Sequence, residues 1–353
     1  MSLLESYFQR IKPLHTPSME MAQARWNSIA KPLHSLGLLE ENVIQMAGIF
    51  GSHQVEISNR CVTVLCADNG VVEEGVTQVG SEITAKVAEN LTKGQTSVNA
   101  MARLANATVL PVDIGMKQDV NISGLLQKKI SYGTHNIAKG PAMSRQQAME
   151  AILTGIHLVQ TLQENGCHII ATGEMGIGNT TTSSAMASVF LQQPPEMVTG
   201  KGAGLSGEGL ERKIQVIHRA LAQNQPNPAD PLDVLSKVGG YDIAGLTGIF
   251  LGGGIYRIPV LMDGLISSIA ALTAVRLCPA VKEYLLASHV SKEPAGKQVL
   301  NVLQKKPMLT CDFCLGEGTG AVAALPILDM ALEVYHSMST FSDIQMKPYQ
   351  PLE

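Results

Sequence analysis

One carboxylate, Glu317, lies between two glycines in the segment CDFCLGEGTGA (residues 311–321), which is otherwise built mainly from apolar and small residues. Glycines on both sides let a substrate approach the backbone closely, as a general base in a pocket requires. A carboxylate is also stabilised at the N-terminus of a helix by the helix dipole. These residues alone leave both interpretations open: a catalytic base, or a loop that leads into a helix.

A second acid among small residues, Glu174, lies in GEMGIGNTTTSSA (173–185). Gly176 and Gly178 leave backbone N–H groups accessible, and the Thr and Ser residues that follow begin a predicted helix. This arrangement suits a phosphate or a carboxylate. The segment is neither G-x-G-x-x-G nor a P-loop, because it lacks the terminal Lys-Ser/Thr pair. A glycine-rich turn without a ligand is the alternative.

Another glycine-rich segment, TGKGAGLSGEGLERK (199–213), ends in Lys213. Flexible backbone with a lysine close by again suits a phosphate. A solvated loop explains the same residues equally well.

Two of the six cysteines, Cys311 and Cys314, form a single C-x-x-C. Such a pair can be a redox centre or half of a zinc site. No second C-x-x-C or H-x-x-x-H is present in the sequence to complete a tetrahedral ligand set. Chance spacing is therefore the favoured interpretation.

The elements that must position these residues are indicated by apolar, β-branched runs, each followed by glycines and a helical pattern. The runs are CVTVLCADNG (61–70), ATVLPVDIG (107–115), HIIATGEMGIGN (168–179), IPVLMDG (258–264) and YLLASHV (284–290). Strands that are apolar on both faces and alternate with helices are typical of a parallel sheet covered on both sides. We therefore predict an α/β fold.

Polar residues stand at the predicted end of each strand, where parallel sheets bind their ligands. They are Asp68, Asn69, Asp113, Glu174, Asn179, Asp263, Ser288 and His289. Helix capping explains any one of them, since Asp and Asn are common caps. Five such ends in one chain favour a shared pocket.

The two ends of the chain carry apolar residues at helical spacing, as in SMEMAQARWNSIA, EENVIQMAGIF and AVAALPILDMALEVYHSM. We expect residues 1–60 and about 322–353 to form a small helical domain. Residues 61–321 would form the large parallel α/β domain that contains the active site.

Composition favours a small-molecule partner over nucleic acid or a membrane. The net charge of −4 gives no electrostatic reason to bind nucleic acid or an anionic bilayer. The longest tempting apolar run, GLISSIAALTAV, ends at Arg276 and is too short to span a membrane. The N-terminal segment mixes charges and lacks the apolar core of a signal peptide. We expect a cytoplasmic protein.

Several longer motifs converge on one family. They are CADNGVVEEGV (66–76), GTHNIAKGPAMSR (133–145), GEMGIGNTT, NQPNP, DVLSKVGGYDIAGLTG (233–248) and GEGTGA. In these motifs and their order, the chain from about residue 30 onward resembles the nicotinate-nucleotide:dimethylbenzimidazole phosphoribosyltransferases, which build the lower nucleotide loop of cobamides. The resemblance implies a Rossmann-like parallel sheet, a small helical domain and a dimer.

The resemblance also implies that Glu317 is the catalytic base. In nicotinate mononucleotide the leaving group is already a pyridinium and departs neutral, so no acid is needed to expel it. The incoming base loses one proton, for which one carboxylate with a pKa raised by burial suffices. The absence of a pyrophosphate leaving group removes the need for Mg²⁺, and we expect no metal or other cofactor.

The same comparison assigns the remaining candidate site residues. Glu174, Met175, Gly176 and Asn179 would line the nucleotide site; Gly202, Lys213 and Ser291 would lie near the phosphate; Leu315 would press on the incoming base. Asp263 is a further candidate.

The sequence departs from the family pattern in two places. KPLHSLGLLE (31–40) has Leu33 and His34 before Ser35 in place of the usual residues. In GVTQVGSEITAKVAENL (75–91), Val79 and Val87 align with positions where users of dimethylbenzimidazole can carry Ser and Gln. Loss of two hydrogen-bonding groups lowers discrimination against bases without a ring nitrogen. Our hypothesis is that phenolic bases are accepted.

Two other functions stay open. The chain could be one subunit of a heterodimer with a paralogue, although both Glu174 and Glu317 are retained. It could also be a redox or metal protein that uses Cys311 and Cys314. A homodimer that binds nicotinate mononucleotide and an aromatic base is the favoured expectation.

Overall fold

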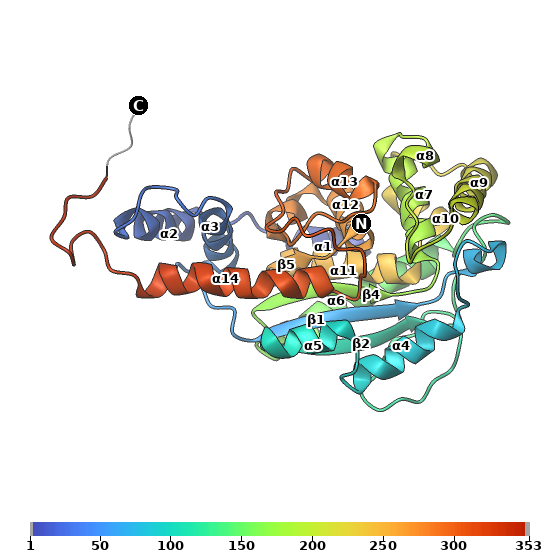
Figure 1. Ribbon diagram of the computed structural model, residues 1–353, viewed down its shortest axis with the longest axis horizontal. Helices are drawn as coiled ribbons and strands as arrows, with labels where there is room; N and C mark the ends of the chain where they lie inside the picture. Colours follow the sequence, from blue (N-terminus) through green and yellow to red (C-terminus); the bar gives the residue numbers. More distant parts are fainter. Residues whose placement is uncertain (1–2, 350–353) are drawn as a thin grey trace.

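The fold is organised around one parallel sheet, seen at the centre of Figure 1. The structure, a computed structural model, describes residues 3–349. Within that range the sheet has six strands in the order β3-β2-β1-β4-β5-β6. The strands are β1 (Arg60–Ala67), β2 (Ala107–Gly115), β3 (Leu126–Gln127), β4 (Ile169–Met175), β5 (Val260–Met262) and β6 (Leu285–Ala287). The predicted α/β class and Rossmann-like sheet are confirmed.

Both faces of the sheet are buried because apolar side chains point alternately to opposite sides. In β1, Val62 and Val64 belong to one hydrophobic cluster, whereas Cys61 and Leu65 belong to the other. The long strands are therefore mainly apolar on both faces, and helices must cover both of them.

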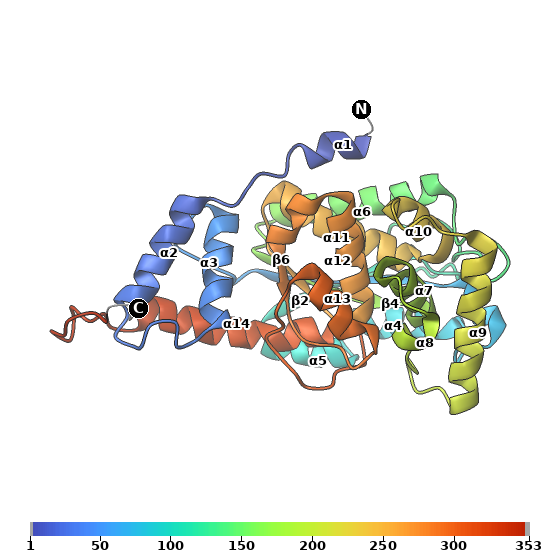
Figure 2. The same cartoon turned by 90° about the horizontal axis from the view of Figure 1, so that it is seen from above.

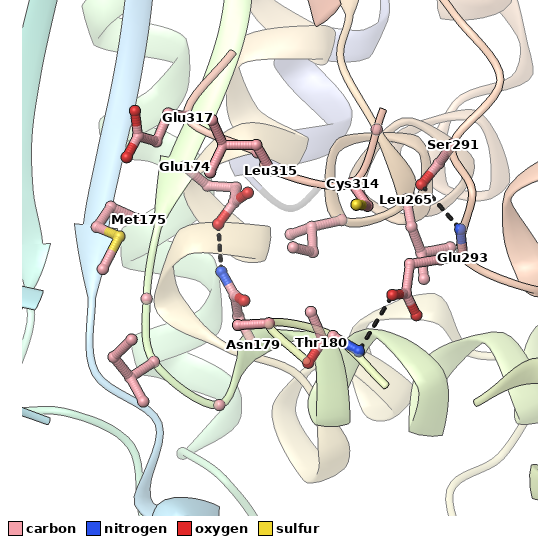
Figure 3. Close-up of a pocket in the computed structure, with 18 of the residues that line it drawn as sticks. Glu174, Met175, Asn179, Thr180, Leu265, Ser291, Glu293, Cys314, Leu315 and Glu317 are labelled. Carbon is pink, nitrogen blue, oxygen red and sulfur yellow. Dashed lines mark hydrogen bonds between the residues drawn. The ribbon is translucent and has the colours of Figure 1, made fainter. Parts of the chain in front are cut away.

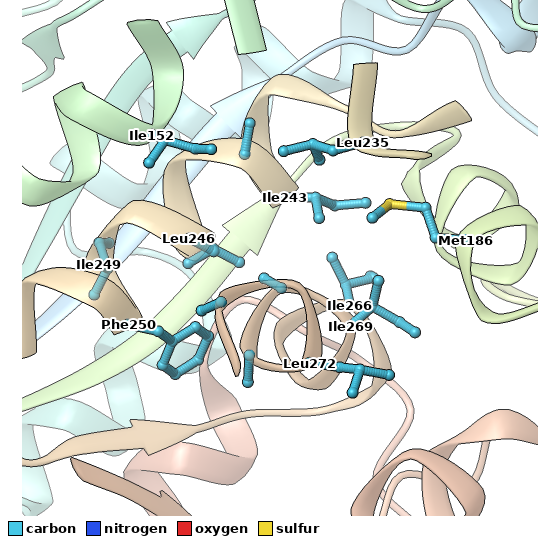
Figure 4. Packing of buried hydrophobic residues seen from close by; sticks show 14 of the residues in the cluster. Ile152, Met186, Leu235, Ile243, Leu246, Ile249, Phe250, Ile266, Ile269 and Leu272 are labelled. Carbon is cyan, nitrogen blue, oxygen red and sulfur yellow. The ribbon is translucent and has the colours of Figure 1, made fainter. Parts of the chain in front are cut away.

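The helices on the Leu65 face make the larger core, shown in Figure 4. They include α6 (Arg145–Glu164), α7 (Asn179–Leu191), α10 (Pro231–Val238), α11 (Tyr241–Tyr256) and α12 (Leu265–Leu277). Helix α11 is buried around most of its circumference. Its close contact with α6 requires glycine, because a Cβ at Gly155 would lie 2.8 Å from the Cα of Gly248.

The opposite face is covered by α4 (Glu82–Thr92), α5 (Ser97–Leu104) and α14 (Thr319–Ser337). Helices α2 (Thr16–Ser28) and α3 (Leu38–Phe50) pack on each other, and α3 packs on α14. At this junction the rings of Trp26 and Tyr335 lie 5.1 Å apart. The cluster formed here continues onto the sheet through Val62 and Val64.

The remaining elements fill the periphery. They are α1 (Leu3–Phe8), α8 (Pro195–Val198), α9 (Gly207–Asn224), α13 (Ala295–Leu303) and the 3₁₀ helices at Gly70–Glu74 and Pro279–Tyr284. Figure 2 shows α1 lying apart from α2 and α3, and α1 packs against α11. Among residues 3–349, no helix is both long enough and apolar enough to cross a bilayer.

The sheet order positions the site. The chain runs outward from β1 through β2 to β3, then returns to β4 on the other side of β1 and continues to β5 and β6. The chain leaves β1 toward one edge of the sheet and leaves β4 toward the other, so the loops after these two neighbouring strands run in opposite directions. Open α/β sheets bind ligands in the crevice between such loops.

Candidate active site

A cavity of about 320 Å³ opens at the carboxyl ends of β4, β5 and β6. Its walls come from segments spread between Val76 and Thr319. Figure 3 shows Glu174 and Asn179 projecting into it from β4 and the start of α7, with Leu265, Ser291 and Leu315 around them. The cavity is large enough to hold a small organic ligand.

Two helix N-termini point at this cavity without a side-chain cap. Helix α7 begins after Gly178 and α12 begins after Gly264, and neither glycine can cap the helix. Residues of both first turns line the cavity. The backbone N–H groups of an uncapped first turn, together with the helix dipole, favour an anion.

The backbone of Glu317 is held in a strained conformation. Gly316, Glu317 and Gly318 all have positive φ, at 89°, 61° and 90°. Asp263 fixes the start of α14, because its Oδ2 accepts the N–H of Gly318 at 3.2 Å and its Oδ1 accepts that of Ala321 at 3.0 Å. A left-handed glutamate persists only where its surroundings hold it, and such strain is common at functional sites.

The Glu317 carboxyl group is half-buried and short of partners. Its Oε2 is buried and accepts no hydrogen bond within the described chain. Burial raises the pKa of Glu317, the backbone N–H of Val98 on α5 lowers it, and the charge of Asp263 raises it. A carboxylate with a raised pKa and an oxygen without a partner, on a residue that lines the cavity, can accept a proton.

Glu174 belongs to a buried polar group. The Nδ2 of Asn179 donates to Glu174 Oε2 and, at 2.9 Å, to Asp242 Oδ2. Burial and then the charges of Asp242 and Asp263 raise the pKa of Glu174 well above its ordinary value, against the hydrogen bond from Asn179. Burial also raises the pKa of Asp242 to about 6. Glu174 therefore holds a proton more readily than an exposed glutamate does.

Lys213 lies behind the cavity wall. Its Nζ is buried and donates to Thr180 Oγ1 at 2.8 Å and to the carbonyl of Gly200 at 3.1 Å. Burial lowers its pKa to about 8, although the charge of Glu293 opposes this. A Cβ at Gly202 would lie 3.5 Å from Nζ, so the ammonium group lies directly behind this glycine, which lines the cavity.

Part of the cavity lining is apolar. Val79, Val87, Met175 and Leu315 line the cavity, and Val79 and Leu315 are 44% and 58% exposed. Such a surface suits the flat ring of an aromatic ligand.

Most of the predicted site residues meet in this cavity. Glu174, Met175, Gly176, Asn179, Gly202, Ser291, Leu315, Glu317, Val79 and Val87 line it, as does Asp263. Of the predicted set, Lys213 does not reach the lining of the cavity as described between Val76 and Thr319.

The expectation that all five strand ends share the pocket is wrong for β1 and β2. Asp68 accepts the backbone N–H of Lys117 at 2.7 Å. Asp113 accepts the N–H of Met116 at 2.9 Å and lies 3.2 Å from Lys129 Nζ. These carboxylates hold the backbone of the loop after β2 and do not line the cavity. At β6, His289 lines the cavity, and Ser288 Oγ lies 2.9 Å from its Nδ1.

Sequence reasoning missed two acids at this site. Glu293 Oε1 accepts the N–H of Gly202 at 3.2 Å and lines the cavity. Asp242 lies behind Asn179. Asp242 follows two glycines and a tyrosine in one of the motifs named above, but an acid in the first turn of a helix is too common to single out.

The cysteines do not assemble into a metal site. All six lie within residues 3–349 and are free, and Cys311 and Cys314 are exposed. Cys314 lines the cavity. Across the part of the chain that the structure describes, no three His, Cys, Asp or Glu side chains are grouped so that they could hold a metal.

Comparison with known proteins gives a consistent result. A family model described as phosphoribosyltransferase matches residues 11–346. Nicotinate-nucleotide–dimethylbenzimidazole phosphoribosyltransferase from Ruminiclostridium cellulolyticum is 48% identical over 99% of both chains. The enzyme of that name from Acetivibrio thermocellus is 47% identical over 98% of this chain and 99% of its own. A crystal structure of CobT from Thermus thermophilus superposes with a TM-score of 0.89 at 36% identity, covering 94% of this chain and 100% of the other.

Proposed function

As a member of the nicotinate-nucleotide–dimethylbenzimidazole phosphoribosyltransferase family, this chain transfers a 5-phosphoribosyl group from nicotinate mononucleotide to an aromatic base, and we propose that Glu317 accepts the proton released in that transfer. The bond between ribose C1′ and the pyridinium nitrogen breaks, and its electron pair stays on nicotinate. A lone pair of the incoming base forms the new bond to C1′. The product serves the nucleotide loop of a cobamide.

The state of the Glu317 carboxyl group is the observation that supports this role most directly. It has a buried oxygen without a partner in the described chain, a raised pKa, and a backbone that Asp263 holds in place. A carboxyl group that lines the cavity and has an oxygen without a hydrogen-bond partner can take the proton of a base bound against it.

The nucleotide would occupy the side of the cavity formed by β4 and α7. Glu174, Met175, Gly176 and Asn179 line that side. The phosphate would lie near Gly202 and Ser291, where the first turns of α7 and α12 favour an anion and Lys213 adds positive charge from behind.

The incoming base would lie against Leu315, Val79 and Val87. Valine at both positions offers no hydrogen bond to a ring nitrogen, so bases without one lose little there. Phenolic bases therefore belong to the proposed substrate range, and a phenol would give its O–H proton to Glu317 and form an O-glycoside.

A panel of bases tests the reaction and the base range together. Purified protein with nicotinate mononucleotide and no added metal is supplied with dimethylbenzimidazole, adenine, phenol or p-cresol, and nicotinate release and ribosylated product are measured. Release that depends on a base supports the transferase. The Val79→Ser/Val87→Gln double variant should shift the ranking toward dimethylbenzimidazole, and an unchanged ranking contradicts the role of the two valines.

We propose a homodimer as the assembly. A heterodimer with a paralogue is the alternative, and the native mass of the protein purified alone and after co-expression with a paralogue separates the two. Base-dependent turnover by the homodimer alone would show that activity does not require a heterodimer.

A further inference from the structure

A carboxylate outside the cavity is linked by hydrogen bonds to two side chains that line it. Asp242, in the first turn of α11, is fully buried. Its Oδ1 accepts the backbone N–H of Ile243 at 2.9 Å, and its Oδ2 accepts an N–H of Asn179 at 2.9 Å. Through Asn179 it is linked to Glu174.

The chemistry of these bonds fixes which way the Asn179 amide faces. Both carboxylates, Asp242 and Glu174, offer acceptor oxygens to the same atom of Asn179. That atom must be the amide nitrogen, because only the nitrogen donates. The amide oxygen is then left for the cavity that Asn179 lines. A flipped amide would place Oδ1 against the Asp242 carboxylate, acceptor against acceptor, so it is Asp242 rather than a protonated Glu174 that fixes the amide.

The surrounding backbone makes room for this carboxylate. A Cβ at Gly176 would lie 3.0 Å from Asp242 Oδ2. A Cβ at Gly240 would overlap Asp242 Oδ1 and lie 2.7 Å from Asn69 Oδ1. Glycine at both positions leaves the room that the Asp242 carboxylate occupies.

We propose that Asp242 is a positioning residue for nucleotide binding: it holds the Asn179 amide with its oxygen toward the cavity and holds Glu174 beside it. This inference rests on the proposed function, because the ligand whose binding it supports is nicotinate mononucleotide. Asp242 itself does not touch the ligand, and the vicinal hydroxyls of a ribose are donors of the kind that an amide oxygen accepts.

Asp242 also sets the charge of Glu174. After burial, its negative charge is the largest cause of the raised pKa of Glu174, and Asp263 and Glu317 add to it. Two further groups belong to the same surroundings: the buried thiol of Cys66 beside Glu174, and Asp68 beside Asp242. A protonated Glu174 can donate a hydrogen bond to the ligand. Removal of the Asp242 charge lowers the pKa of Glu174, so that Glu174 loses its proton at a lower pH.

The Asp242→Asn variant tests both effects. The shape is kept, but one of the two oxygens becomes a donor, so either Ile243 or Asn179 loses its acceptor. We expect the KM for nicotinate mononucleotide to rise by about tenfold or more, with a much smaller change in kcat. The pH above which KM begins to rise should move to a lower value, a shift that a purely structural role would not produce.

A second variant and two controls complete the test. Gly240→Ala leaves the Asp242 side chain chemically unchanged but displaces its carboxylate. It should also raise the KM for nicotinate mononucleotide. If Asp242→Asn does not fold, this variant tests the role of Asp242 by itself. Asp113→Asn removes another buried carboxylate, and Gly140→Ala places a methyl group where nothing lies within 4 Å. Both controls should keep the wild-type KM and its pH dependence.

The outcomes separate this inference from the proposed function. Absence of base-dependent nicotinate release in the wild-type protein contradicts the proposed function itself. Wild-type turnover with an unchanged KM in both Asp242→Asn and Gly240→Ala overturns only the role of Asp242. A loss confined to kcat overturns it as well.

Discussion

At the scale of single residues, the proposed transfer needs one proton acceptor, and Glu317, whose Oε2 has no hydrogen-bond partner in the described chain, is the residue proposed for it. Its neighbour Glu174 has a pKa raised well above its ordinary value, which suits a hydrogen-bond donor rather than a base. The two acids are thus separated by their environments, as in other sites where one carboxyl group accepts a proton and the other keeps its own.

Glu317→Gln should keep the affinity for nicotinate mononucleotide and lower kcat by about 10²–10⁴-fold, because it preserves shape and removes the base. The raised pKa predicts the pH dependence: the base must be ionised, so wild-type kcat should fall as pH falls through the pKa of Glu317. That acidic limb should be absent from the residual activity of the variant. Turnover close to wild type would leave Glu317 as the start of a helix only.

Lys213→Met should raise the KM for nicotinate mononucleotide without lowering stability at neutral pH. The pKa of Lys213 is lowered from 10.5 to about 8, so the unfolded chain binds the extra proton between these values and the folded protein gains stability as pH rises across them. Below pH 8 the buried cation costs stability, and methionine relieves that cost. A melting temperature at neutral pH several degrees below wild type would contradict this.

Glu174, Asn179 and Asp263 could be predicted because they lie at strand ends, where the parallel sheet directs them to one edge. Gly202, Ser291, Leu315, Val79 and Val87 could be assigned only from the family resemblance. The proximity of Lys213 to the phosphate stays a prediction; what the sequence does not reveal is that its ammonium group donates to Thr180 and lies next to Gly202 rather than in the cavity lining. Asp242 could not be recognised, because its role depends on Asn179, a side chain 63 positions away.

At the scale of elements, the start of α14 packs closely against residues at the ends of β4, β5 and β6. A Cβ at Gly173 in β4 would lie 2.5 Å from the carbonyl oxygen of Glu317, and Asp263 after β5 caps the helix. On the third side, Gly320 lies against the ring of His289, which packs on Phe313 with ring centroids 5.2 Å apart. The position of Glu317 is therefore set by backbone contacts rather than by its own side chain.

Gly320→Ala tests this arrangement, because the added methyl group would overlap the His289 ring and force α14 away from β6. We expect a stability loss of about 1–3 kcal/mol and a large fall in kcat. Gly207→Ala, at the first position of α9 with nothing within 4 Å, should be neutral or slightly stabilising. Chemical denaturation and steady-state kinetics measure both, and a wild-type kcat in the Gly320 variant would show that this close packing is not needed.

Sequence patterns predicted five strands because each is a run buried on both faces. The pattern could not reveal β3, which is only two residues long (Leu126–Gln127) and half-exposed. Nor could it tell which strand-end acids face the ligand, since Asp68 and Asp113 look the same in sequence as Asp263 but bind loop N–H groups.

At the scale of the whole molecule, the strand order was not readable from the sequence, because it depends on which side of β1 each returning strand packs. The location of α1 against α11 and the continuity of the α2–α3 cluster with the sheet are long-range packing results of the same kind. The division into a small helical domain and a large α/β domain remains a proposal.

The cavity is lined by segments between Val76 and Thr319, so a bound nucleotide contacts parts of the chain that are far apart in the sequence. Binding to the folded state alone stabilises that state. Nicotinate mononucleotide should therefore raise the melting temperature with concentration, by an amount that corresponds to about 2.7 kcal/mol at a hundred times Kd. Glu317→Gln should show the same increase, since binding is retained. A melting temperature independent of nucleotide concentration would place the ligand elsewhere.

Helix α14 begins beside the cavity and ends at the junction where Tyr335 meets Trp26. Trp26 is the single tryptophan of the chain and is buried against that ring, with the ammonium group of Lys31 5.1 Å from its centroid. Its ultraviolet emission is therefore an intrinsic optical reporter of the far end of the helix that follows Glu317. Titration with nucleotide, read at the emission maximum, tells without any attached dye whether occupancy of the cavity is transmitted along α14 or stops at its first turn.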